Sequence, residues 1–266
     1  MKIGFIGTGN MGGAILKGYS KKAASSGSEI LAYDADAAKL MEIAEKYRVY
    51  PAKSPGLLVA GSDIVILGLK PDIFEKVMPE ISEAYTDDKL VVSMAAGVSI
   101  SFIEKYLGQK AKVVRIMPNT PALIGQGMTA VAKNVNVDDE LFSTVMDIFD
   151  STGKAEEVTE DLMDCVTALS GSSPAYAYMF IEALVSAAEK NGMERAKGTV
   201  FAAQAMLGAA KMVLETKESP ERLRENVCSP GGTTIEAVQV LKKRDMAGVI
   251  EEAFSAAMNK SKVMTK

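Results

Sequence analysis

Histidine is absent from this chain of 266 residues, and cysteine occurs only twice. Structural zinc sites draw on histidine or on several cysteines, so the composition argues against one, and we expect no metal site. Histidine-based acid–base catalysis and any Ser-His-Asp triad are excluded as well. Any chemistry in this protein must therefore use hydroxyls, carboxylates, lysines, backbone groups, water or a cofactor.

Long apolar runs and a strong excess of one charge are also missing. No apolar stretch reaches the roughly 18 residues of a membrane span, and the first residues run into a strand pattern rather than a leader segment. The net charge of −4 favours neither a nucleic-acid nor a membrane surface. Because Cys165 and Cys228 are too few for a disulfide framework, we expect a cytoplasmic protein.

Strand and helix patterns alternate in the first part of the chain. This alternation predicts an α/β fold, with a parallel sheet covered by helices on both faces. The predicted strands are Lys2–Ile6, Glu29–Tyr33, Asp63–Leu69, Lys89–Met94, Lys112–Met117, Met128–Ala132 and Ala155–Val158. The predicted helices are Asn10–Ala24, Asp36–Tyr47, Pro71–Ala84, Ser99–Leu107 and Asp138–Ser151.

The pattern changes near residue 160, after which no β-rich run appears. We therefore predict two domains: a Rossmann-type dinucleotide-binding domain over residues 1–160 and an all-α domain over residues 161–266. Small residues in the second domain allow its helices to approach closely. Its predicted helices are Asp161–Ser170, Pro174–Asn191, Ala196–Thr216, Pro220–Val227, Thr234–Lys243 and Met246–Lys262.

The turn after the first strand carries the glycine pattern of a phosphate-binding loop. Gly7 suits a tight turn, Gly9 lets the backbone approach a pyrophosphate, and Gly12 lets the next helix pack on the sheet. Asp34 follows the second strand, where an acid hydrogen-bonds a ribose 2′-hydroxyl and repels a 2′-phosphate. No arginine stands beside it, so NADH is favoured over NADPH. The alternatives are a glycine-rich turn without a ligand and an Asp34 that only caps the next helix.

The loops that follow the later strands are the next candidates. Gly68–Pro71, Met94–Gly97 and Met117–Pro121 stand at the predicted carboxyl ends of parallel strands. Open α/β sheets bind their ligands beyond those ends. Each loop taken alone could equally be structural.

A second glycine-rich segment lies in the helical domain, where Gly231 and Gly232 precede Thr233, Thr234 and a helix. Successive backbone N–H groups at such a helix start can point at one anion, and the threonine hydroxyls add donors. A small carboxylate suits this cradle. The alternative is a well-capped helix start that binds nothing.

The residues resemble the pyrroline-5-carboxylate reductase family over essentially the whole chain. The resemblance implies NAD(P)H-dependent reduction of 1-pyrroline-5-carboxylate to L-proline, the last step of proline biosynthesis. It also implies a homodimer interlocked through the helical domain, with larger rings of dimers such as a decamer in some members. The matching segments are residues 4–11, 70–71, 92–97, 115–121, 169–176 and 228–234, of which the last two are highly specific.

The resemblance assigns roles to matching positions. It implies a dinucleotide held by Ile6, Gly7, Thr8, Gly9, Asn10, Met11, Asp34, Gly68, Leu69, Lys70, Pro71, Met94, Ala95, Ala96 and Asn119. It implies a substrate held by Asn226, Ser229, Gly231, Gly232, Thr233 and Thr234, with Glu160 or its neighbour Asp161 nearby. Members that favour NADP often carry an Asn-Arg-Ser-like stretch after the second strand, where this chain has Asp34-Ala35-Asp36.

The missing histidine agrees with this chemistry. A protonated imine is already electrophilic, so its reduction needs an oriented hydride more than a strong acid. We therefore expect Thr234, with Ser229, to position the ring nitrogen while solvent supplies the proton. One alternative is a β-hydroxyacid dehydrogenase with a catalytic lysine in the second domain, for which candidates such as Lys190, Lys197 and Lys211 lack a supporting motif. The other is a dinucleotide sensor without catalytic activity.

Overall fold

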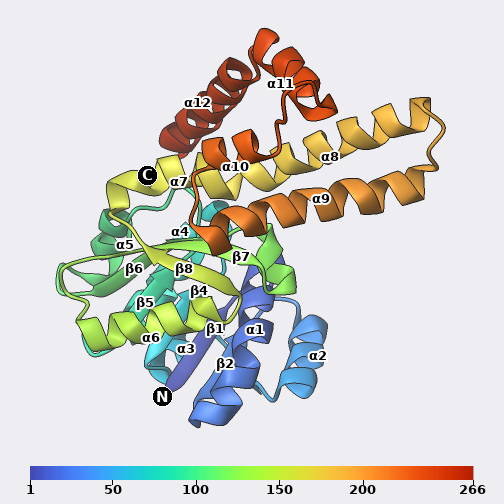
Figure 1. The fold of residues 1–266 in the computed structure, drawn as a ribbon. Coiled ribbons are helices and arrows are strands. Elements are labelled where there is room, and N and C mark those ends of the chain that lie inside the picture. The colour runs from blue at the N-terminus through green and yellow to red at the C-terminus, as the bar shows by residue number, and fades with distance from the viewer. Residues whose placement is uncertain (266) are drawn as a thin grey trace. The chain divides into compact units, whose positions relative to one another are not determined.

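The computed structural model describes residues 1–265, in which eight strands form one sheet (Figure 1). The strand order is β3-β2-β1-β4-β5-β6-β7-β8, and pairing is parallel from β3 to β6. The order reverses direction between β1 and β4, which is where open α/β sheets bind ligands. The strands are β1 (Lys2–Ile6), β2 (Glu29–Tyr33), β3 (Tyr50–Pro51), β4 (Ile64–Leu67), β5 (Leu90–Ser93), β6 (Lys112–Met117), β7 (Gly127–Lys133) and β8 (Gly153–Glu157).

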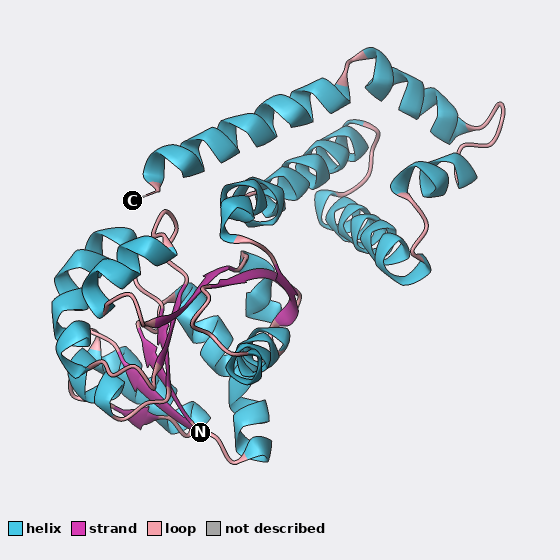
Figure 2. Ribbon diagram, turned by 90° about the vertical axis from the view of Figure 1, so that its left-hand side faces the viewer, coloured by secondary structure: helices cyan, strands magenta, loops and turns pink. Residues whose placement is uncertain are grey.

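Helices cover both faces of the sheet (Figure 2). Every side chain of β4 and β5 is buried, as expected for central strands with apolar residues on both faces. One face packs against α1 (Asn10–Ser26), α2 (Ala37–Tyr47) and α6 (Asp139–Asp150). The other face packs against α3 (Pro55–Ala60), α4 (Pro71–Ala84) and α5 (Ile100–Leu107).

Strand β7 departs from the parallel arrangement that the sequence predicts. It pairs antiparallel with β6 and parallel with β8. The chain between β6 and β7 holds only the short 3-10 helix η1 (Thr120–Ile124), and a parallel crossover requires about a dozen residues or more. The short β3, α3 and η1 are also missing from the predicted elements, because they have too few residues to show a periodic pattern.

The structure divides into two compact units at a different place from the predicted boundary. The first unit holds residues 1–172 and 257–265, and the second holds Ser173–Ala256. Residues 161–170, predicted as one helix, form three short pieces in the first unit. Met163 is fully buried there among Met117, Ala130 and Ala132, which ties this segment to the sheet. The pieces are η2 (Glu160–Leu162), α7 (Met163–Val166) and the π-helix η3 (Thr167–Gly171).

The end of α12 (Met246–Met264) belongs to the first unit too. The Ser261 hydroxyl donates a hydrogen bond of 2.6 Å to a carboxylate oxygen of Asp164. Gly97 has φ +74°, and a Cβ there would lie 2.5 Å from the Met264 carbonyl oxygen. Only glycine therefore fits both the backbone and the space, and the last helical turn packs on the loop after β5.

The second unit is a set of helices with few buried side chains. Val185 and Ala202 are buried, whereas Met179, Phe201 and Leu214 are each more than 60% exposed. An apolar surface of this extent marks an interaction site. Within residues 1–265 no helix has the length and apolar character needed to cross a membrane. The unit comprises α8 (Ser173–Lys190), α9 (Arg195–Thr216), α10 (Pro220–Asn226), α11 (Thr233–Lys243) and the first part of α12.

Candidate active site

The turn between β1 and α1 depends on close contact between backbone segments. Gly7 has φ +90°, and a Cβ on it would lie 2.6 Å from the Gly68 carbonyl oxygen. A Cβ on Gly12 would collide with the Gly7 carbonyl oxygen. These approaches hold the start of α1 against the carboxyl end of β4, as the glycine pattern predicts.

Gly9 has a different environment, and it allows a direct test of whether a dinucleotide fits. No atom lies within 4 Å of the position a Cβ would take on Gly9. The first turn of α1 has no side-chain cap and no acidic residue. Its amide N–H groups therefore face space in which a pyrophosphate can accept their hydrogen bonds. The turn fits the phosphates of a dinucleotide.

Asp34 makes more contacts with the protein than the sequence suggests. One carboxylate oxygen accepts hydrogen bonds of 2.7 Å from the Thr8 amide and from the Thr8 hydroxyl, and the other accepts one of 3.0 Å from the Asp36 amide. The Lys39 ammonium group lies 3.7 Å away. Burial by itself raises the pKa of the Asp34 carboxyl, but these hydrogen bonds and Lys39 outweigh it and lower the pKa below the usual value. Asp34 thus ties the end of β2 to the phosphate turn.

The remaining cofactor candidates stand mostly at one edge of the sheet. Residues 6–11, 68–71 and 94–96 follow the carboxyl ends of β1, β4 and β5, which are neighbours. Lys70 caps α4, whose first residue is Pro71. Asn119 differs, because its amide donates to the Ser170 carbonyl at 3.1 Å and accepts from the Met128 amide at 2.8 Å. Its side chain therefore joins η3 to β7, and a cofactor contact remains a prediction.

Glu160 lies in an ion pair that the sequence does not predict. Its Oε1 accepts hydrogen bonds from the Arg115 guanidinium at 3.1 Å and from the Ile100 amide at 2.7 Å. The Arg115 side chain is 4% exposed, and two of its nitrogens have no partner within residues 1–265. The sequence does contain a signal for this pair: Arg115 is a charged residue among the apolar residues of strand β6, and a buried charge requires a partner. A substrate contact by Glu160 stays a prediction, and Asp161 beside it is exposed.

The predicted carboxylate cradle forms the start of α11 in the second unit. Gly231 has φ +71°, and no atom lies within 4 Å of its Cβ position. Gly232 is the N-cap, and no side chain caps the helix. Gly232 N–H bonds to the Ser229 carbonyl at 3.0 Å, which closes the turn before the helix. The first amides of α11 are therefore available to an anion.

The hydroxyls of the cradle are also available. Thr233 and Thr234 are exposed, as is Ser229. None of the three hydroxyls makes a hydrogen bond within residues 1–265. The Asn226 amide donates to Glu218 at 3.3 Å, which keeps it at the end of α10. The predicted substrate residues between 226 and 234 therefore lie together in the second unit. Glu160, the remaining candidate, belongs to the first unit.

Metal-binding clusters are not found among residues 1–265, where no three acidic or cysteine side chains gather in a suitable geometry. The exposed hydroxyls can donate to a carboxylate or accept from a protonated ring nitrogen.

Comparison with known proteins decides the family. The family model for pyrroline-5-carboxylate reductase dimerisation matches residues 160–264, and the model for coenzyme F420-dependent NADP oxidoreductases matches residues 2–97. A pyrroline-5-carboxylate reductase of Escherichia coli (strain K12) is 44% identical over 265 residues, covering 100% of this chain and 98% of that protein. The chain belongs to the pyrroline-5-carboxylate reductase family.

Solved structures of other pyrroline-5-carboxylate reductases share the whole fold. The reductase from Coxiella burnetii is 35% identical with a TM-score of 0.93, covering 99% of this chain and 98% of that one. The Plasmodium falciparum reductase, solved with NADP bound, is 33% identical with a TM-score of 0.87, covering 100% of this chain and 98% of that one.

The predicted family, fold class and activity are confirmed: this is an NAD(P)H-dependent oxidoreductase of the family that catalyses the final step of proline biosynthesis. Its dimerisation domain supports oligomerisation. The β-hydroxyacid dehydrogenase and the non-catalytic sensor are set aside by this membership.

Proposed function

We propose that the first unit holds NAD(P)H along the edge formed by β1, β4 and β5, and that the cradle at α11 holds 1-pyrroline-5-carboxylate for reduction to L-proline. The observation that carries this assignment is a helix start without a side-chain cap, beside hydroxyls of Ser229, Thr233 and Thr234 that have no hydrogen-bond partner within residues 1–265. These hydroxyls and the first amides of α11 can all donate hydrogen bonds. Such a group of donors suits a small anion with several oxygens.

The carboxylate of the substrate is the group that this cradle recognises. Amides at the start of α11 donate to its oxygens, and the positive end of the helix dipole favours its charge. Gly231 and Gly232 leave room for the oxygens to approach the backbone. The Thr233 hydroxyl adds a further donor, and Asn226 lies at the end of α10 just before the cradle.

Orientation of the ring is the second task of these residues. The Thr234 hydroxyl, with that of Ser229, accepts a hydrogen bond from the protonated ring nitrogen and so fixes which carbon is presented. When bound, the reduced nicotinamide supplies the hydride that converts the C=N bond to a C–N bond. Solvent supplies the proton on nitrogen, because the protonated imine needs no acid during the transfer. A site without histidine is sufficient for this reaction.

Two features of the first unit bear on the choice between NADH and NADPH. Asp34 favours NADH by repelling a 2′-phosphate, and this is the basis of our proposal that NADH is preferred. Lys39, 3.7 Å from Asp34, favours a phosphate instead. The ratio of kcat/KM for NADH to that for NADPH measures the balance. A strong preference for NADPH would overturn the role given to Asp34.

The exposed apolar helices of the second unit support a homodimer. Side chains such as Met179, Phe201 and Leu214 are covered in our proposal by a second copy of the same unit. Light scattering distinguishes this dimer from a decamer, which is a ring of such dimers. A cytoplasmic location completes the proposal and rests on the two free cysteines, Cys165 and Cys228.

The Thr234→Ala variant tests the cradle. Removal of the hydroxyl leaves the ring nitrogen unpositioned, and kcat/KM for 1-pyrroline-5-carboxylate falls roughly 10- to 100-fold, or about 1.4–2.8 kcal/mol. The KM for the dinucleotide is unchanged, because the cofactor residues belong to the other unit.

A matched control is Thr144→Ala, which removes a threonine hydroxyl from the exposed side of α6. This control keeps its kcat/KM within about twofold. If Thr234→Ala also retains full kcat/KM, Thr234 has no part in substrate recognition.

A further inference from the structure

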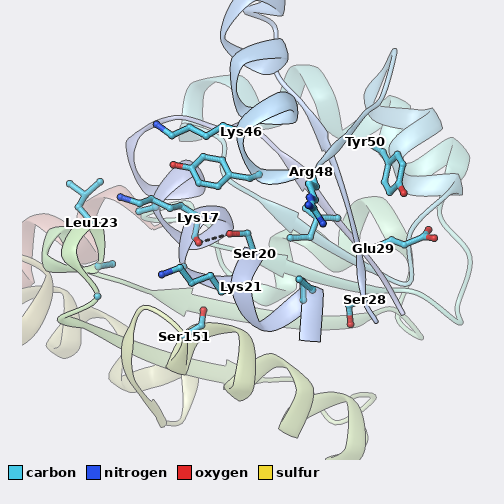
Figure 3. A pocket seen from close by; sticks show the side chains of 18 of the residues that line it. Lys17, Ser20, Lys21, Ser28, Glu29, Lys46, Arg48, Tyr50, Leu123 and Ser151 are labelled. Carbon is cyan, nitrogen blue, oxygen red and sulfur yellow. Dashed lines mark hydrogen bonds between the residues drawn. The ribbon is translucent and has the colours of Figure 1, made fainter. Parts of the chain in front are cut away.

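A large cavity opens on the first unit among α1, the end of α2 and the η1 loop (Figure 3). Its volume is about 920 Å³, within the range of roughly 300–1,000 Å³ that small-molecule sites occupy. Ile30 and Tyr50 line it, so it reaches the amino ends of β2 and β3. The cofactor candidates stand mostly at carboxyl ends of strands, and none of them lines this cavity. The cavity is therefore separate from the proposed dinucleotide site of the same unit.

The charge of this cavity is opposite to that of the chain. Lys17, Lys21, Lys46 and Arg48 line it, with Glu29 as the only carboxylate among the lining residues, in a protein of net charge −4. Glu29 pairs with a lysine outside the cavity at 3.6 Å. Within residues 1–265 none of the four cations forms an ion pair with a carboxylate.

Three of the lysines also point the same way. Figure 3 shows the side chains of Lys17, Lys21 and Lys46 extending in one direction, towards the side of the cavity where Leu123 lies. Lys17 and Lys21 are four residues apart on α1, a spacing at which like charges repel. By contrast, the adjacent Lys22 pairs with Asp147 at 3.0 Å. A bound anion would relieve the repulsion that the unpaired lysines experience.

Helix dipoles do not account for this cluster. Lys46 lies in the last turn of α2, where a cation is favourable. Lys17 and Lys21 lie inside α1, before its last turn, and gain nothing from its carboxyl end. Arg48 has φ +56°, a left-handed conformation that glycine adopts at lower cost. Arg48 is the C-cap of α2, and its amide donates to the Ala44 carbonyl, as at many helix ends.

We propose that this cavity binds a small polyanion with two or three linked phosphate groups, either an inorganic polyphosphate or the phosphate chain of a nucleotide. Ammonium groups supply compact charges for phosphate oxygens, and the Arg48 guanidinium holds two oxygens at once. The exposed ring of Tyr50 offers a stacking surface for a base, which a nucleotide has and a polyphosphate lacks. The proposal does not rest on the roles given to the cradle.

Isothermal titration calorimetry of the full-length protein tests the proposal with two probes, sodium tripolyphosphate and ATP. NADP⁺ is kept at saturation, so that neither probe is measured at the dinucleotide site. We expect saturable binding with Kd below about 1 mM at low ionic strength, weakening as salt is added because the cations are exposed. Tighter binding of ATP identifies a nucleotide, and equal binding identifies the phosphate chain alone; both outcomes support the site.

Variants locate the binding. Lys17→Gln/Lys21→Gln weakens binding about tenfold or more, while the control Lys53→Gln/Lys110→Gln, two exposed lysines outside the cavity, stays within about twofold. Arg48→Gly keeps the left-handed backbone, so it folds and still loses affinity. All of these variants retain reductase activity.

Two outcomes would overturn the proposal. They are no saturable binding of either probe by the wild-type protein and equal binding by the two double variants.

Discussion

Removal of the Glu160 carboxylate separates a structural role from the substrate contact that the family resemblance implies. Arg115 is almost fully buried, and one of its terminal nitrogens donates a hydrogen bond to Glu160. Its Nε and its other terminal nitrogen have no hydrogen-bond partner within residues 1–265. Breaking a buried pair from one side costs about 3–5 kcal/mol, because the remaining charge is left uncompensated. The Glu160 side chain is 33% exposed, so water reduces the cost to the low end of that range.

We therefore expect Glu160→Ala to lower the free energy of unfolding by about 3 kcal/mol. For a unit of this size each kcal/mol lowers Tm by about 2–4 °C, so calorimetry should record a fall of roughly 6–12 °C. The α5 helix keeps its other cap, because the Ser99 hydroxyl accepts from the Phe102 amide at 3.1 Å. At temperatures where the variant is folded, a KM for 1-pyrroline-5-carboxylate that stays within about twofold shows a purely structural role for Glu160.

Two further variants make this prediction specific. Asp161→Asn, at the exposed neighbouring carboxylate, leaves Tm unchanged. Arg115→Met/Glu160→Met replaces both charges by apolar groups and loses less stability than Glu160→Ala. An unchanged Tm together with a much higher KM in Glu160→Ala would refute the structural reading and place Glu160 at the substrate.

Three other changes test the contacts around the cofactor edge. Lys39→Glu lowers kcat/KM for NADPH relative to NADH by about tenfold, since it removes the cation nearest Asp34. The pKa of Asp34 in the folded state is lowered from 3.8, so the ionised carboxylate stabilises the folded protein fully above pH 3.8. This stabilisation is lost as pH falls through the folded pKa. In urea titrations, Asp34→Asn should therefore lose less stability in acid than the wild type does. Ser261→Ala removes a part-buried hydrogen bond to the Asp164 carboxylate and lowers the free energy of unfolding in urea by about 1.5–3 kcal/mol.

Local signals in the sequence predict much of the fold because they act within a few residues. The predicted helix Ser99–Leu107 forms α5 with Ser99 as its N-cap, and α4 spans the predicted Pro71–Ala84. Gly7 and Gly12 of the phosphate turn have the close approaches that their pattern predicts. The cap of α5 and the start of α4 depend on backbone geometry that one short segment sets by itself.

The features that the sequence does not predict depend on distant partners. The antiparallel β7 follows from the length of a connection, and the place of residues 161–172 follows from the burial of Met163 against the sheet. The second unit also depends on a distant partner. The sequence predicts its helices, but in our proposal the surface that covers their exposed apolar side chains belongs to a second molecule. No periodicity within a segment carries this information.

Asp34 illustrates how such a partner changes a functional argument. The motif treats its carboxylate as free to accept from a ribose hydroxyl. In the structure the carboxylate already accepts three hydrogen bonds, two of them from Thr8 in the phosphate turn. A carboxylate has about four acceptor positions, so one is left for a ribose, and its charge is partly offset by Lys39. We therefore expect weaker discrimination against a 2′-phosphate than the motif alone implies, because Asp34 also holds the turn closed.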